Sequence, residues 1–356
     1  MKFTIAKGII ENIISSMQPF LNKKDSSAIT SHIYLEIIGA RLIVKSTDYE
    51  MGCEAVVNDI TDLFDGKATV NGGNFLNIIR RLKDDFIEFE ASGNNLQIKQ
   101  KRSNFKLPMY DANEYPSFPV LDNLQALDIN TLNLISCVKK ITPSIDNNNP
   151  KFELNGALID IKSQKINFVA TDTRRLAIST LENISNESSQ IIIPKKAIVE
   201  IQKLFLDEAT IRYDETNLVI SNNNYTFFTK LINGKFPDYE RIIPQNLKHK
   251  FQLSKSILIE AIKLVTSIES KIKITFSNNT TVFESLDDDS ESKTQIDVNI
   301  GIDEEFYIAV NSKYILDFLS STNSENITLG FNESNLPFYL EDGNFITIVM
   351  PIVLDK

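Results

Sequence analysis

Apolar and polar side chains alternate along much of the chain, in short runs that turn residues separate. Residues 86–90 (FIEFE) and 96–99 (LQIK) alternate in this way, and residues 93–95 (GNN) stand between them. Asp342-Gly343 separates two similar runs near the C-terminus. A period of two residues indicates half-buried strands, and Gly or Asn between two such runs indicates a hairpin. The pattern therefore predicts many antiparallel hairpins.

Six other stretches place apolar side chains three and four positions apart, which is the period of an amphipathic helix. They are residues 6–17, 73–83, 130–141, 194–205, 254–266 and 311–321. Pro194 and Asn311 begin two of these stretches, and both residue types are favoured at helix starts. Together with the strands, the six helices predict an α+β fold.

The pattern repeats three times along the chain. The strand starts at Phe3, Leu127 and Phe251 are spaced 124 residues apart, and the segments LIVKSTD and INFVATD end at Asp48 and Asp172, again 124 apart. Self-similarity at a fixed spacing indicates tandem structural copies. We therefore expect three copies of a unit with two helices and about eight strands. The expected boundaries are 1–120, 121–243 and 244–356, with proline-bearing connectors closing the first two copies.

Composition indicates a folded protein of a reducing compartment. The 356 residues are 42% hydrophobic and 24% charged, which suits two or three compact domains. Cys53 and Cys137 form no CxxC pattern, so neither a disulfide framework nor a thiolate metal site is predicted. No export signal and no run of eighteen apolar residues is visible. We expect a soluble cytoplasmic protein without cofactor, metal or membrane association.

Motifs of catalysis are missing from the chain. It has no P-loop, no GxSxG and no HExxH, and its two histidines, His32 and His249, stand in unrelated contexts. We therefore expect a protein that is not an enzyme.

Positive charge is concentrated on the predicted helices of an acidic chain. These helices carry twelve basic and four acidic side chains, although the net charge of the chain is −10. A repeated β-rich interaction scaffold without DNA is an alternative, but a positive surplus on six equivalent helices favours a shared anionic partner. No base-reading motif and no Trp is present, so phosphate contacts that ignore sequence are expected, and these permit sliding on duplex DNA.

The size of the copies constrains the assembly. A copy of this length is roughly 35 Å across. Three copies in a ring leave a hole of about 5 Å, whereas six leave roughly 35 Å, and duplex DNA needs about 20 Å. A head-to-tail homodimer with two-fold symmetry is therefore expected.

Several segments also match one known family, in the same order. They are MKFT at 1–4, LNG at 154–156, FVATD at 168–172 with Arg175 and Leu176, FPDY at 236–239 with Arg241, and VMP at 349–351 with Leu354. Over essentially its whole length the chain resembles the bacterial DNA sliding clamps, the beta subunit of DNA polymerase III. The resemblance implies three tandem copies of the DNA clamp (processivity factor) fold, in a ring-forming homodimer that encircles duplex DNA and slides along it.

The same resemblance implies a set of partners. They are double-stranded DNA bound without regard to sequence, the DNA polymerase III alpha subunit, the clamp loader, other polymerases, ligase and mismatch-repair proteins. In this family the protein partners bind through short linear peptides, which occupy a cleft between the second and third domains.

Carried over position by position, the cleft comprises Leu154, Thr171, Thr173, Arg174, Arg175, Leu176, Pro237, Arg241, Ile242, Asn311, Tyr314, Ile348, Met350, Pro351, Ile352 and Leu354. Its aliphatic members are expected to form an apolar pocket, and its three arginines are expected to hold peptide polar groups at the rim. From the residues alone, Met350-Pro351 is also compatible with the end of an edge strand, and Thr171-Asp172 with a turn. The family commonly has Gly-His or Ser-His where Thr173-Arg174 stand and Arg at the position of Val353, so a shifted peptide preference is expected.

Two further surfaces follow from the resemblance. The DNA-facing residues would be Lys23, Lys24, Arg80, Arg81, Lys139, Lys140, Lys195, Lys196, Lys203 and Lys263. Lys23-Lys24 is equally compatible with a solvated turn. The dimer contacts would join the edge strand of the first domain to the third domain of the partner through Phe105, Leu107, Leu264 and Val265, with core burial as the equal alternative.

Overall fold

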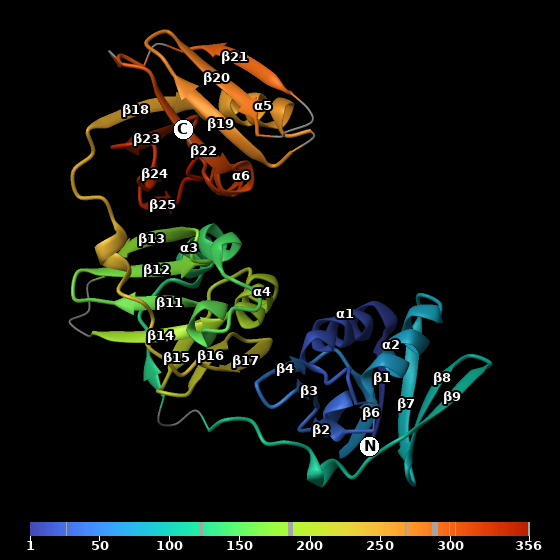
Figure 1. The fold of residues 1–356 in the computed structure, drawn as a ribbon. Helices are drawn as coiled ribbons and strands as arrows, with labels where there is room; N and C mark the ends of the chain where they lie inside the picture. Colours follow the sequence, from blue (N-terminus) through green and yellow to red (C-terminus); the bar gives the residue numbers. More distant parts are fainter. Residues whose placement is uncertain are drawn as a thin grey trace. The chain divides into compact units, whose positions relative to one another are not determined.

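The structure is a computed structural model that describes residues 1–25, 27–120, 124–183, 188–267, 269–286, 291–298, 300–302 and 304–354. The chain divides into two compact units, and Figure 1 labels the helices and strands of both. Unit 1 comprises Met1–Leu132 and Lys196–Leu231, and unit 2 comprises Asn133–Lys195 and Ile232–Lys356. The predicted domain boundary after residue 120 adjoins residues 121–123, which lie outside the described residues.

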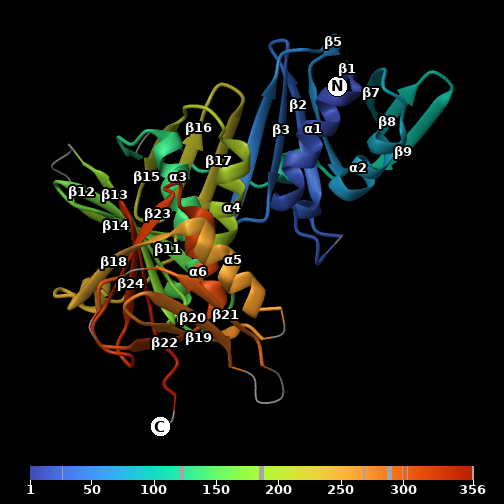
Figure 2. The same ribbon diagram turned by 90° about the horizontal axis from the view of Figure 1, so that it is seen from above.

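Six α-helices form in the described residues, and each matches a stretch of helical period in the sequence. They are α1 (Lys7–Met17), α2 (Gly72–Arg81), α3 (Thr131–Ile141), α4 (Lys195–Leu204), α5 (Lys255–Val265) and α6 (Ser312–Ser321). Helix α1 packs against α2 in unit 1, and α5 packs against α6 in unit 2 (Figure 2). The predicted helices are thus confirmed to within about two residues at each end.

Shorter 3-10 helices punctuate the connections. They are η1 (Gln18–Phe20), η2 (Ile29–Ser31), η3 (Ala112–Glu114), η4 (Thr142–Ser144), η5 (Phe152–Asn155) and η6 (Tyr239–Ile242).

Unit 1 contains two antiparallel sheets. The five-stranded sheet has the order β5 (Thr61–Phe64), β1 (Lys2–Ala6), β7 (Phe86–Ser92), β8 (Asn95–Gln100), β9 (Ser103–Pro108). The eight-stranded sheet has the order β10 (Gln125–Ala126), β15 (Thr210–Tyr213), β16 (Asn217–Ser221), β17 (Tyr225–Lys230), β4 (Met51–Val57), β3 (Arg41–Thr47), β2 (His32–Ile38), β6 (Gly66–Asn71).

Unit 2 repeats this plan. Its eight-stranded sheet has the order β14 (Ser189–Pro194), β11 (Gly156–Ile161), β12 (Lys165–Thr171), β13 (Arg175–Glu182), β25 (Phe345–Val349), β24 (Phe338–Asp342), β23 (Asn326–Phe331), β18 (His249–Ser254). Its four-stranded sheet has the order β21 (Lys293–Asp297), β20 (Thr280–Ser285), β19 (Lys271–Phe276), β22 (Phe306–Asn311). In the described residues, β1–β9, β10–β17 and β18–β25 give nine, eight and eight strands to the three copies, close to the expected eight each.

Both eight-stranded sheets contain strands from two successive copies. In unit 1, β17 of the second copy pairs with β4 of the first, and Phe227 lies opposite Cys53. In unit 2, β13 of the second copy pairs with β25 of the third, and Leu176 lies opposite Ile348. Backbone hydrogen bonds therefore join neighbouring copies, which explains why the compact units do not coincide with the sequence repeats.

The repeat extends to the hydrogen bonds of one turn. Between β3 and β4, Asp48 Oδ1 accepts from the backbone N–H of Glu50 (3.1 Å) and Met51 (3.0 Å), and Thr47 Oγ1 donates to the carbonyl of Met51 (2.9 Å). Between β12 and β13, Asp172 Oδ1 accepts from the N–H of Arg174 and Arg175, both at 3.0 Å, and Thr171 Oγ1 donates to the carbonyl of Arg175 (2.6 Å).

The two turns also share a strained backbone position. Tyr49 and Thr173 have φ angles of +72° and +71°, which residues other than glycine rarely adopt. The turn interpretation of Thr171-Asp172 is therefore confirmed, and it does not compete with a place in the cleft.

Candidate functional site

Unit 2 contains all sixteen residues of the predicted cleft. They come from η5, the turn from β12 to β13, the connector around η6, the start of α6, and β25 with the segment that follows it. Two backbone hydrogen bonds hold that last segment, from Met350 N–H to the carbonyl of Arg174 (2.9 Å) and from Ile352 N–H to the carbonyl of Ala309 (2.7 Å). The C-terminal segment is thus held by both the turn before β13 and strand β22.

The aliphatic cleft residues divide into a buried floor and an exposed part. Leu154, Leu176 and Ile348 are buried in one hydrophobic cluster, together with Phe236 and Tyr339. Ile242 and Met350 remain 45% and 41% exposed. Of these five side chains, Ile242 and Met350 therefore provide most of the accessible apolar surface.

A buried polar network positions the connector. Tyr239 Oη donates to Asp160 Oδ2 (2.6 Å) and accepts from Asn167 Nδ2 (2.8 Å). Burial raises the pKa of the Tyr239 hydroxyl, so it remains a donor at neutral pH. These bonds anchor η6, which carries Arg241 and Ile242. The sequence analysis gave Asp160, Asn167 and Tyr239 no role in the site. A lone Asp or Asn inside an apolar strand nevertheless indicates a buried hydrogen bond.

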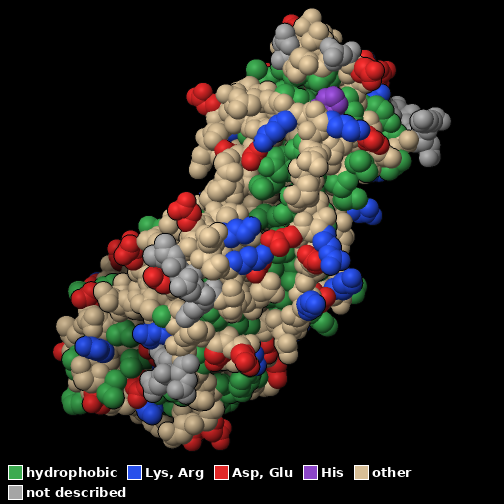
Figure 3. All heavy atoms as spheres, turned by 90° about the vertical axis from the view of Figure 1, so that its left-hand side faces the viewer, with side chains coloured by type: hydrophobic (Ala, Val, Ile, Leu, Met, Phe, Trp, Pro, Cys, Tyr) green, Lys and Arg blue, Asp and Glu red, His purple; other side chains and the backbone are tan. Residues whose placement is uncertain are grey.

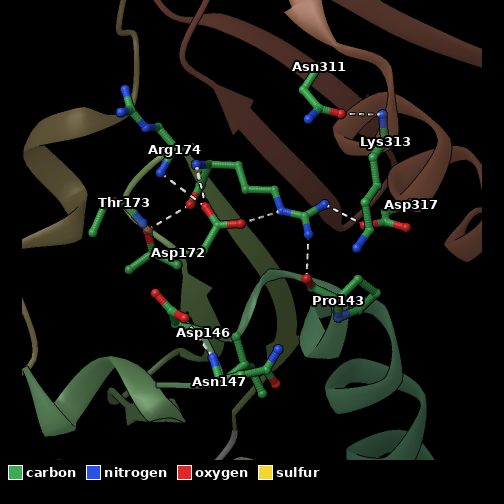
Figure 4. Close-up of polar contacts among 12 residues, drawn as sticks. Pro143, Asp146, Asn147, Asp172, Thr173, Arg174, Asn311, Lys313 and Asp317 are labelled. Atoms are coloured by element: carbon green, nitrogen blue, oxygen red, sulfur yellow. Dashed lines mark hydrogen bonds and ion pairs between the residues drawn. The ribbon is translucent and has the colours of Figure 1, made fainter. Parts of the chain in front are cut away.

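Arg175 does not lie at the rim of the cleft. Its side chain is 4% exposed, and its Nε and Nη1 atoms form ion pairs with Asp172 Oδ2 (3.0 Å) and Asp317 Oδ2 (2.7 Å). Its Nη2 donates to the carbonyl of Pro143 (Figure 4). The prediction that Arg175 holds a peptide group is therefore wrong, because three of the five N–H donors of its guanidinium face inward.

The other two cleft arginines are exposed. Arg241 Nε forms an ion pair with Asp238 Oδ2 at 2.6 Å, and its side chain is 85% exposed. Arg174 lies at the tip of the turn (Figure 4), and its side chain forms no ion pair with the residues that the structure describes. Among the described residues, Arg174 is thus the cleft arginine whose charge remains available to a peptide.

The two predicted cleft residues on α6 have different surroundings. Asn311 is the N-cap of α6, where its side chain accepts from the N–H of Lys313 (3.0 Å; Figure 4). Tyr314 is half-buried, its ring centre lies 4.7 Å from the guanidinium carbon of Arg175, and burial raises the pKa of its hydroxyl. Thr171, Pro351, Ile352 and Leu354 are half-buried, and Thr173 and Pro237 are exposed.

Eight of the ten predicted DNA-facing residues are exposed, namely Lys23, Lys24, Arg80, Arg81, Lys139, Lys196, Lys203 and Lys263. Three of them have acidic neighbours: Arg80 lies 3.8 Å from Glu11, Lys196 lies 2.6 Å from Asp48 and Lys203 lies 2.9 Å from Glu200. The solvated-turn interpretation of Lys23-Lys24 stays open. On the face in Figure 3, basic and acidic side chains lie beside one another, so this face is not uniformly positive.

The remaining two predicted DNA-facing residues are half-buried. Lys195 Nζ donates to the carbonyl of Ile145 and to Asn147 Oδ1, both at 2.7 Å, and burial lowers its pKa. Lys140 Nζ donates to Asn344 Oδ1 at 3.1 Å. These ammonium groups are half-buried and already bond to protein atoms, so they are weaker candidates for phosphate contacts than the exposed residues without acidic neighbours.

The four predicted dimer residues differ in exposure. Phe105 and Leu107 are half-buried on β9, which is an edge strand of the five-stranded sheet, as expected. Leu264 is 59% exposed, but Val265 is 1% exposed on the core-facing side of α5. The prediction for Val265 is wrong, and core burial, the alternative, holds for this residue.

In the described parts of the chain, no helix has the length and apolarity that a membrane span requires. The same residues contain no cluster of three or more His, Cys, Asp or Glu side chains that could hold a metal ion.

Family models cover the chain in three consecutive parts. The N-terminal domain of the DNA polymerase III beta subunit matches residues 1–119, the central domain matches 128–238 and the C-terminal domain matches 240–352. The chain belongs to the DNA polymerase III beta subunit family. The three tandem copies expected from the sequence are therefore three beta-clamp domains.

Similar proteins agree with this assignment. The beta sliding clamps of two Helicobacter pylori strains are 39% and 38% identical to the chain, and each alignment covers 99% of the chain and 100% of the relative. A crystal structure of the H. pylori beta clamp bound to DNA ligase peptide matches with a TM-score of 0.94 at 39% identity, over 99% of this chain and 100% of that one. A beta subunit structure from Pseudomonas aeruginosa, 23% identical with a TM-score of 0.91, shares the fold.

Proposed function

We propose that this beta-clamp protein is a DNA polymerase processivity factor that acts as a ring-shaped homodimer around duplex DNA. The observation that carries the proposal is the match of all three beta-subunit domains, in order, over residues 1–352. The three domains would span 1–120, 121–243 and 244–356, and the protein would work in the cytoplasm. A ring holds DNA by topology rather than by tight contacts, so it needs no catalytic group of its own, and an external ATPase, the clamp loader, would open it.

The candidate cleft in unit 2 is the proposed docking site for replication and repair proteins. The DNA ligase peptide on the H. pylori clamp makes a ligase a direct candidate partner. The other candidates are the DNA polymerase III alpha subunit, the clamp loader, other polymerases and mismatch-repair proteins. Ile242 and Met350 would contact apolar peptide side chains, since both are about half exposed beside the buried floor. A peptide of five or six residues would bind with a Kd of about 1 μM, or roughly −8 kcal/mol, which permits exchange.

The exposed basic side chains on the helices are the proposed contacts to DNA. They would attract phosphates without reading bases, which leaves the ring free to move along the duplex. Phe105, Leu107 and Leu264 are the remaining proposed dimer contacts.

Topological retention on DNA tests the ring. After loading onto nicked circular DNA, the protein should stay bound through gel filtration, and linearising the circle should release nearly all of it, because a ring slides off free ends. Salt should change retention on the circle little, since topology does not depend on charge. Equal retention on circular and linear DNA would reject the ring, and no retention on either would favour the alternative, a repeated interaction scaffold without DNA.

Arg174 provides a test of peptide preference. Glutamine in place of Arg174 should weaken binding of a cleft peptide that carries one acidic residue by up to about five-fold, because an exposed ion pair contributes about 0.2–1 kcal/mol. The loss should shrink at high ionic strength. Fluorescence anisotropy gives the dissociation constants of two peptides: the acidic peptide, and the same peptide with the acidic residue replaced by its amide.

Arg241→Gln is the matched control for this measurement. Arg241 already pairs with Asp238, so its removal should matter less for the acidic peptide. Indistinguishable affinities of the wild-type protein for the acidic and amide peptides would contradict a role for Arg174 in selection.

A further inference from the structure

Comparison of the two equivalent turns shows that the turn conformation does not require Arg175. At the turn that begins with Thr47, the position that corresponds to Arg175 is Met51, yet Thr47 and Asp48 form the same hydrogen bonds to the turn backbone as Thr171 and Asp172. The turn therefore forms without an arginine. The buried guanidinium at position 175 must have another role, since burying a charge is unfavourable unless it is paired.

The partners of Arg175 come from three separate elements (Figure 4). Asp172 belongs to the turn before β13, Asp317 belongs to α6 and the carbonyl of Pro143 belongs to η4. A guanidinium is planar and carries its donors in a fixed fork, so it holds three acceptors in one defined arrangement, which an ammonium does not. One side chain thus connects the turn from the second domain to a helix of the third.

Two residues of the candidate cleft depend on this connection. Tyr314 lies one helical turn before Asp317, and its ring packs against the guanidinium of Arg175. The carbonyl of Arg174, which adjoins Arg175 in the turn, accepts from the N–H of Met350. Any shift of the turn would therefore move Met350, one of the two exposed aliphatic cleft residues.

We propose that Arg175 is a positioning residue for the peptide cleft. It acts through Asp172 and Asp317 to hold the turn, Tyr314 and Met350 in the arrangement that binds a peptide. The inference rests on the proposed function, because it concerns affinity for the same peptides. Its distinctive consequence is that peptide affinity depends on Asp317, a residue outside the predicted cleft.

A double-mutant cycle tests this consequence. Arg175→Lys and Asp317→Asn should each weaken binding of a fluorescent cleft peptide about tenfold, within the range found for residues of one hydrogen-bond network. The double variant should be little weaker than either single variant, because both remove the same connection. Glu284→Gln is the matched control: it removes the ion pair of Lys293 with Glu284 (2.8 Å) in the same unit and should leave affinity unchanged.

Amide exchange of the wild-type protein gives a second test that does not require a variant to fold. Saturating peptide should slow exchange at residues 314–317 of α6 as well as at Met350, because the guanidinium joins them. A general gain in stability would instead slow exchange evenly across unit 2.

The outcomes separate the inference from the proposed function. Failure of the wild-type protein to bind any cleft peptide rejects the proposed function. Normal wild-type binding with unchanged affinity in Asp317→Asn, whether or not Arg175→Lys is weakened, rejects the positioning role and leaves the function intact. Additive losses in the double variant, or protection confined to Met350, would also reject it.

Discussion

Replacing Arg80, Arg81, Lys139 and Lys263 together by glutamine is expected to lower the affinity for duplex DNA by tenfold or more. All four side chains are exposed on α2, α3 or α5. Each side chain that neutralises a phosphate contributes about 0.9 to the slope of log K against log salt, so removing it should make the slope shallower by about that amount. Fluorescence anisotropy with a labelled duplex over a series of salt concentrations measures both the affinity and the slope.

A second quadruple variant controls for net charge. Glutamine at Arg41, Arg102, Lys151 and Lys235 also removes two arginines and two lysines, all exposed and all outside the six helices. This control should retain most of the affinity and the slope. If both variants lose equal affinity, the effect comes from the overall charge of the protein, and the helices are not the DNA-binding surface.

Lowering the pH from 7 to 4 is expected to destabilise unit 1 by up to about 3 kcal/mol through His32 alone. The imidazole is 4% exposed and stacks on Tyr110 with 4.3 Å between ring centres. Its Nδ1 has no hydrogen-bond partner among the described atoms, and burial lowers the pKa of His32 to about 4. Each unit by which the pKa of His32 differs between the unfolded and the folded protein corresponds to about 1.4 kcal/mol in the free energy of unfolding.

The sign follows from where the proton binds. The unfolded chain binds a proton at His32 near pH 6.5, whereas the folded protein does so only near pH 4. The stabilising contribution is therefore complete above pH 6.5 and is lost as the pH falls towards 4. Urea unfolding at pH 7 and pH 4.5 measures the difference.

Phenylalanine in place of His32 isolates this group from the carboxylates that titrate in the same range. The variant keeps an aromatic ring against Tyr110 but cannot take up a proton, so its stability should fall less between pH 7 and 4.5 than that of the wild type. His249→Asn, which removes the other histidine of the chain, should preserve the wild-type difference. Equal losses in wild type and His32→Phe would show that another group causes the acid sensitivity.

Local periodicity was sufficient to predict the repeated elements. The helices depend on apolar spacing within eleven or so residues, and the structure places all six where the sequence indicates. The Thr-Asp repeat could also be recognised, because its turn is held by side chains that bond to neighbours two to four positions away. Such interactions are contained within the segment that shows the pattern.

Exposure within a candidate site was harder to predict. Leu154, Leu176 and Ile348 look alike in the sequence to Ile242 and Met350, yet the first three are core and the other two are surface. Val265 and Leu264 are neighbours with opposite exposure. They stand at the end of a helix, and helix ends are located only to within one or two residues, so the apolar pattern did not determine which of the two faces the core. Arg175 was assigned to the rim from its place in the family resemblance, which does not show how deeply its side chain is buried.

The sequence by itself determined the α+β class, the six helices, the triplication and the family, since each rests on short-range spacing or on the order of motifs. Tertiary structure decided which strands share a sheet and which charges are buried. Arg175 illustrates the reason: its partners Pro143 and Asp317 are 32 and 142 positions away in the chain. No local pattern encodes such distant partners, because folding alone brings them to one guanidinium.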